Sequence, residues 1–167
     1  MAYLNRFNSV DFLITQLVPL TSQPGIDPMV LSSLAGIIAV EAVTAYELAI
    51  KDIFVDFSTK KHIVFGHFVQ TTLDRLNGRI KYQDIKDTMV KSYGDKYLQK
   101  FNVKIKEKNR TVLATEHVDL IQTYDTLIIG RHSFVHLGQL TMTLPEAIHY
   151  YSIGKYLIAA LDETMRR

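Results

Sequence analysis

The sequence has no cysteine among its 167 residues and little excess charge of either sign. Without cysteine the protein cannot form disulfides, use a thiolate nucleophile or bind zinc through thiolates. The formal net charge of +2 excludes strong attraction of the whole molecule to nucleic acid or anionic membranes, so any basic binding surface must be local. The absence of cysteine fits a reducing cytoplasm.

No segment has the pattern of an export signal or of a membrane span. The apolar stretch near the N-terminus is interrupted by Asn8, Asp11 and Gln16, and no small-residue cleavage site follows it. The most apolar stretch, residues 30–50, contains Glu41 and Glu47, and a bilayer core penalises each carboxylate by roughly 3 kcal/mol. We therefore expect a cytoplasmic protein that makes no contact with membranes.

Strand patterns are nearly absent as well, and the chain has neither an internal repeat nor a low-complexity tract. Residues 111–114 are too short to count as a strand, whereas helical patterns dominate after the Pro-rich linker at residues 19–28. The sequence thus predicts an all-α, up-and-down helical bundle with long central helices. We expect one domain over residues 1–167, with an N-terminal helix and linker in 1–27 and a core bundle in 28–167.

The helix ends are predicted from capping residues. Asp27 followed by Pro28 begins a central helix that extends to about residue 57, and Thr143 and Glu146 have the spacing of a capping box. The other predicted helices cover about 60–77 (ended by Asn77 and Gly78), 82–93 (ended by Gly94), 95–109, 115–137 (capped by Thr115, ended by Gly138) and 144–165.

Three polar side chains occur within six residues of the predicted penultimate helix: Arg131, His132 and His136. With Ile128 set at 0° around the helix axis, helix geometry places Arg131 at about −60°, His132 at about +40° and His136 at about +80°. The core-facing stripe is predicted to consist of Ile128 and of three residues within about 40° of its direction, Ile121, Tyr124 and Val135.

Burying a guanidinium or an imidazole without partners costs several kcal/mol, so a helix that only packs would carry Leu or Ala at these positions. In the structural alternative, Arg131 pairs with Glu41 or Glu47 of the central helix and the histidines are packing residues. The coincidence of all three within six residues favours a functional site.

Arginine, a polar residue, three further residues and then histidine, near the end of a penultimate helix, resemble the R-x(4–6)-H motif of the HEPN superfamily. Here the motif runs from Arg131 to His136. The segments EAVTAYELAIKDIF, YGDKYLQKF and EAIHYYSIGKYLIAALDETM extend the resemblance to RiboL-PSP-type stand-alone HEPN proteins, from Pro28 to the end of the chain. Leu137 stands where the family often has glycine, and Gly138 stands where members controlled by a nucleotidyltransferase antitoxin have tyrosine.

The resemblance implies a metal-independent endoribonuclease that acts as a homodimer, with one composite site between two motif helices. Its reaction would be attack of a ribose 2′-OH on the neighbouring phosphate, with His136 as acid/base, Arg131 as electrostatic stabiliser and His132 orienting the phosphate or sharing proton transfer. It further implies a growth-restricting or anti-phage effector, with an antitoxin or defence-system partner. The alternative is a catalytically silent HEPN dimer that binds RNA, nucleotide or a partner protein.

Gly130 costs the motif helix about 1 kcal/mol relative to alanine. Either a second copy of the helix approaches closely there, or the glycine packs within the chain.

Three other patterns have two interpretations each. His132 and His136 have the H-x3-H spacing of a metal site, but no third ligand is evident and Asp125 lies nearly two turns away. Lys104, Lys108 and Arg110 either bind RNA phosphates or form a solvated helix face. The tyrosines either stack on bases or belong to the core, the latter being favoured by their helical spacing; they are Tyr150, Tyr151 and Tyr156.

Overall fold

The computed structural model describes residues 2–22, 24–75, 78–139 and 141–166, and these residues contain helices and no β-strand. The predicted all-α fold is therefore confirmed. The helices, in chain order, are η1 (Ala2–Phe7), α1 (Asn8–Leu17), η2 (Val18–Ser22), α2 (Pro28–Lys61), α3 (Ile63–Leu73), η3 (Asp84–Val90), η4 (Lys91–Tyr93), α4 (Asp95–Glu116), α5 (Leu120–Leu137) and α6 (Leu144–Met165).

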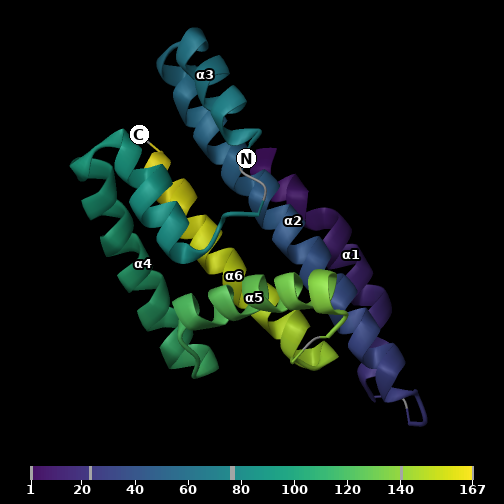
Figure 1. Cartoon of the computed structure of the whole chain (residues 1–167). Coiled ribbons are helices and arrows are strands. Elements are labelled where there is room, and N and C mark those ends of the chain that lie inside the picture. Colours follow the sequence, from purple (N-terminus) through teal and green to yellow (C-terminus); the bar gives the residue numbers. More distant parts are fainter. Residues whose placement is uncertain (1, 23, 76–77, 140, 167) are drawn as a thin grey trace.

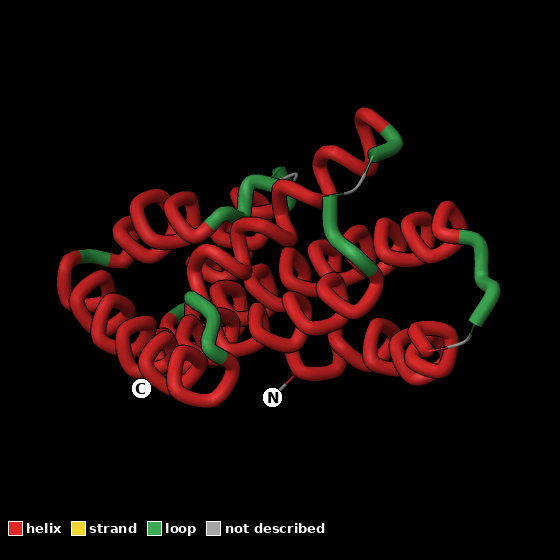
Figure 2. Tube along the Cα trace, turned by 90° about the horizontal axis from the view of Figure 1, so that it is seen from below, coloured by secondary structure: helices red, strands yellow, loops and turns green. Residues whose placement is uncertain are grey.

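The long helix α2 is the centre of the arrangement. In Figure 1, α1 lies along one side of α2, α3 folds back beside its far end, and α4 lies on the opposite side of the molecule with α6 between them. Helix α5 crosses α6, running from the end of α4 to α2. Seen from below, the helices are joined by short loops (Figure 2). The C-terminal half of α5, which carries Arg131 and His136, is thereby placed beside α2.

Helix α2 begins as predicted, because the Asp27 side chain accepts a hydrogen bond from the Met29 N–H and Pro28 occupies the first turn. It continues four residues beyond the predicted end at Phe57, to Lys61. By length and composition it could cross a membrane, yet within the fold it buries a long series of apolar residues, among them Ile38, Tyr46 and Phe54.

Two predicted helices differ in kind or in extent. Helix α3 covers only Ile63–Leu73 of the predicted 60–77, and Asn77, its predicted stop, lies outside the described residues. The segment predicted as one α-helix over 82–93 is mainly the π-helix η3 followed by the 3-10 helix η4. It ends at Gly94 as predicted, with φ +99°.

The predicted boundary between the next two helices is wrong. Helix α4 continues through Thr115 to Glu116, and Asp119, not Thr115, caps α5 by accepting a hydrogen bond from the Gln122 N–H at 2.9 Å. Asn109, the predicted end of α4, lies inside that helix. Its side chain donates to Asp119 and accepts from the Leu120 N–H, both at 2.8 Å, and so ties the two helices together.

The last helix follows the prediction closely. Thr143 and Glu146 form the capping box, and α6 runs from Leu144 to Met165. Tyr151 is buried at the centre of the core and stacks on Tyr46, whose hydroxyl donates to the Tyr151 carbonyl at 2.5 Å. The N-terminal segment packs into the same core through Tyr3, Phe7, Val10 and Leu17.

Gly36 of α2 sets how closely the end of α5 approaches. A Cβ at this position would lie 2.2 Å from the ring of Phe134. We expect Gly36→Ala to lower the free energy of unfolding by about 1 to 2 kcal/mol, because overpacking costs about 1 to 3 kcal/mol and the gain in helix propensity returns up to about 1. Urea denaturation measures the loss. In a Phe134→Leu background the same substitution should be tolerated; an equal loss there would show that this contact is not the cause.

Candidate functional site

Arg131, His132 and His136 line one cavity of about 430 Å³. The cavity lies where α5 meets α2 and the segment that follows α3, and its other lining residues are Val43, Gly78, Arg79, Lys81, Ile128 and Ile129. Three of the lining side chains belong to arginine or lysine and two are imidazoles, whereas none is a carboxylate. A cavity of this composition favours an anionic ligand. Arginine and lysine side chains commonly bind the phosphate groups of nucleic acids.

Arg131 is half-buried, and its Nε atom is fully buried without a hydrogen-bond partner among the described residues. A buried donor without an acceptor costs about 1 to 3 kcal/mol of folding free energy, so each one in a folded protein calls for an explanation. An anionic ligand in the cavity supplies one, since it would accept from a guanidinium that the fold has already partly desolvated.

The structural alternative for Arg131 is wrong. Glu47 is occupied elsewhere, because its Oε1 accepts from Lys51 Nζ at 2.8 Å and its Oε2 from the Gly78 N–H at 2.9 Å. Glu41 is exposed. No ion pair of Arg131 is found within the described ranges, so the guanidinium remains available to a ligand.

The predicted core-facing stripe of α5 is confirmed for Tyr124 and Ile128, which are buried, and for Ile121, which packs against the core, but it is wrong for Val135. Val135 is 50% exposed, whereas Leu127 is completely buried and Phe134 packs on Gly36. The buried face is therefore centred about 100° from Ile128, toward Leu127. Arg131 therefore lies about 40° from the centre of the buried face and is half-buried, whereas His132 and His136 lie on the exposed face.

The two histidines are in mutual contact. Their ring centroids are 4.4 Å apart, with the planes inclined by 49°, and both side chains are exposed. Imidazoles four residues apart on one face of a helix can act together on one bound group, one of them as proton acceptor and the other as proton donor. The site so assembled places two imidazoles beside an arginine.

Gly130 is buried within its own chain. Its small size therefore serves packing inside the protein, and it offers no open surface for the close approach of a second helix.

Asp125, one of the carboxylates near the cavity, is tied to the backbone. Its Oδ1 accepts from the Tyr82 N–H at 2.9 Å. Burial raises the pKa of this carboxyl, and the hydrogen bond from Tyr82 opposes the rise. Asp125 joins no cluster of three potential metal ligands, and neither do His132 and His136, in the part of the chain that the structure describes.

The predicted RNA-binding residues of α4 lie elsewhere. In Figure 1, α4 is at the opposite end of α5 from the motif. Lys108 pairs with Glu163 of α6 at 2.6 Å, Lys104 pairs with Glu107 at 2.7 Å within α4 and with Glu163 at 3.8 Å, and Arg110 is exposed. The two lysines thus stabilise the contact between α4 and α6, and an RNA-binding role for the three residues stays a prediction.

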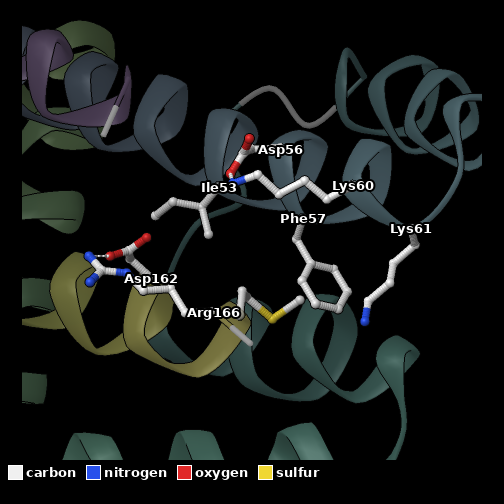
Figure 3. A pocket seen from close by; sticks show the side chains of 8 residues that line it. Ile53, Asp56, Phe57, Lys60, Lys61, Asp162 and Arg166 are labelled. Atoms are coloured by element: carbon white, nitrogen blue, oxygen red, sulfur yellow. Dashed lines mark hydrogen bonds and ion pairs between the residues drawn. The ribbon is translucent and has the colours of Figure 1, made fainter.

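A second pocket, of about 280 Å³, lies between α2 and the C-terminal end of α6 (Figure 3). Four of its charged side chains form two ion pairs, Lys60 with Asp56 at 2.5 Å and Arg166 with Asp162, and Lys61 Nζ lies 5.2 Å from the centroid of the Phe57 ring. Two carboxylates therefore offset the cations of this pocket, whereas no carboxylate lines the cavity beside Arg131.

The sequence did not indicate that Arg79 and Lys81 belong to this region. Gly78 was singled out only as a helix stop, and Glu47 only as a possible partner of Arg131. The usable signal was the alternation of charged and apolar residues from Arg79 to Tyr82, which is typical of an extended segment with one buried face.

Comparison with known proteins gives one match. A family model described as RiboL-PSP-HEPN matches residues 2–166, essentially the whole chain. No curated protein and no solved structure matches the chain.

Proposed function

The chain belongs to the RiboL-PSP-HEPN family, and from that premise we propose that it is a metal-independent endoribonuclease acting as a homodimer. The observation that carries the proposal is the buried, unpartnered Nε of Arg131 at the edge of a cavity that also receives two adjacent imidazoles. A scissile phosphate held at the cavity would accept from the guanidinium of one protomer and be reached by the imidazoles of the other.

The reaction is an internal transesterification. The ribose 2′-oxygen attacks the adjacent phosphorus, the bond to the 5′-oxygen breaks, and the products are a 2′,3′-cyclic phosphate and a 5′-OH. One imidazole takes the 2′-OH proton, and a second, protonated imidazole gives a proton to the leaving oxygen, so no charge accumulates on either oxygen. Arg131 stabilises the negative charge that builds on the phosphoryl oxygens.

The homodimer is supported by the apolar side chains beside the histidines. Ile129 and Val135 are each 50% exposed and Leu137 is 69% exposed, all within the last turns of α5. Exposed apolar groups around a polar centre are typical of a protein interface. Pairing of two such faces would bring Arg131 of one protomer toward His136 of the other. Growth arrest on expression, relieved by inactivating the motif, would support a toxin or defence role.

Cleavage without metal is the direct test of the proposed function. We expect purified protein to cut single-stranded RNA in EDTA and to leave 2′,3′-cyclic phosphate ends, identified by mass spectrometry. A substrate with a single 2′-deoxynucleotide at the cleaved position should resist cutting there, because the nucleophile is missing. Cutting of that substrate, or activity that EDTA abolishes, would contradict the proposal, and RNA binding without cleavage would favour the silent HEPN dimer.

A further inference from the structure

A short segment, residues 78–82, crosses one side of the cavity, and we call it the strap. Its backbone is held at alternate residues by side chains of α2 and α5. The three hydrogen bonds run from the Gly78 N–H to Glu47 Oε2 (2.9 Å), from the Tyr124 hydroxyl to the Ile80 carbonyl (2.8 Å) and from the Tyr82 N–H to Asp125 Oδ1 (2.9 Å). The strap is therefore fixed relative to the helix that carries the motif.

Side chains of the strap alternate in direction. Ile80 is completely buried, whereas Arg79 and Lys81 are exposed and line the cavity with Arg131. Neither cation has an ion-pair partner in residues 2–22, 24–75, 78–139 and 141–166. A buried isoleucine between two pinned backbone positions thus directs two unpaired cations to the same side as the motif arginine.

We propose that the strap is a phosphate-binding element of the ribonuclease site. Arg79 and Lys81 hold backbone phosphates of single-stranded RNA next to the one that Arg131 and His136 act on, and Glu47 positions the strap without touching RNA. This inference rests on the proposed function, because it takes RNA as the ligand of the cavity. Backbone contacts of this kind give affinity and register without reading the base sequence.

The size of the effect follows from counterion release. Each phosphate contact with a single strand contributes about 0.7 to the slope of log affinity against log salt concentration, so two contacts contribute about 1.4. Their loss raises the Kd by roughly 20-fold at about 0.1 M salt. Residues that contact only flanking phosphates should change RNA binding and KM far more than kcat.

The experiment measures binding of a 2′-O-methyl RNA oligonucleotide, which cannot be cleaved by 2′-OH attack, by fluorescence anisotropy over about 0.05 to 0.3 M KCl. Arg79→Ala/Lys81→Ala should show the weaker binding and the smaller salt slope. The matched control, Lys91→Ala/Lys96→Ala, removes the same charge from exposed positions on η4 and α4 that do not line the cavity, and it should bind like the wild type. Equal losses in both double variants, or none in the strap variant, would overturn the proposal.

Substitution of Glu47 provides a second test, in which the direction of the change in RNA affinity decides the outcome. Removing a negative charge near a cationic cavity strengthens RNA binding by electrostatics alone. If Glu47 positions the strap, Glu47→Ala instead weakens binding several-fold, and Glu47→Gln, which keeps an acceptor for the Gly78 N–H, restores it. Tighter binding by a folded Glu47→Ala variant would contradict the positioning role.

The two proposals can fail separately, and the results differ. If the strap does not bind phosphates, the strap variant binds the 2′-O-methyl RNA normally while Arg131 remains essential for cutting. If the ribonuclease is wrong, no RNA is cut by the wild type, whereas the binding comparison still decides whether the strap holds phosphates.

Discussion

Arg131→Met is expected to slow RNA cleavage strongly while leaving the protein at least as stable as the wild type. The cleavage rate should fall by about 10²- to 10³-fold, the usual loss when one donor to a charged transition state is removed. Stability should rise by about 1 kcal/mol, because methionine keeps the apolar stem and removes the buried Nε that has no partner among the described residues. Single-turnover cleavage in EDTA and urea denaturation measure the two effects.

Arg131→Lys separates charge from shape. Lysine keeps the positive charge but lacks the planar fork that binds two phosphate oxygens at once, so we expect a rate between those of the wild type and the methionine variant. A methionine variant that unfolds more easily than the wild type would assign Arg131 to the fold. Cleavage within tenfold of the wild-type rate would remove it from the site.

His136→Ala is expected to lower the cleavage rate by about 10²- to 10⁴-fold, the range typical of a lost general acid or base. His136 is exposed on α5, so its removal should leave the free energy of unfolding nearly unchanged. His132→Ala should cause a smaller loss if His132 orients the phosphate, and an equal loss if it shares proton transfer across the 4.4 Å between the rings.

The matched control for the histidine variants is His67→Ala, an exposed histidine on α3 away from the cavity. It should cleave at the wild-type rate. Normal cleavage by both His132→Ala and His136→Ala would contradict an acid/base role for the pair, since no other histidine lines the cavity among the described residues.

Features that depend on neighbouring residues could be predicted from the sequence. The Asp27–Pro28 start of α2 and the capping box of Thr143 and Glu146 follow from local hydrogen bonding, and the structure has both. The start of α5 could not be predicted in this way. Asp119 caps that helix with the help of Asn109, ten residues earlier, while the equally suitable Thr115 is absorbed into α4.

The orientation of α5 was predicted in part. Tyr124 and Ile128 of the predicted stripe are buried and Ile121 packs against the core, but Val135 is exposed, because contacts with other helices turn the buried face toward Leu127 and place Phe134 over Gly36. The motif residues could still be found, because their identity and spacing do not depend on this rotation. The strap could not, since its position is set by side chains from two distant helices.

The central claim is that Arg131 of one protomer and His136 of its partner act on the same phosphate. Heterodimers of an Arg131→Met chain and a His136→Ala chain, carrying different affinity tags and purified through both, test it by their cleavage rate in EDTA. Each heterodimer retains one intact arginine and one intact histidine on opposite chains, so we expect substantial recovery where both homodimeric variants are inactive. A heterodimer no more active than either variant alone, or a wild-type protein that is active as a monomer, would contradict the claim.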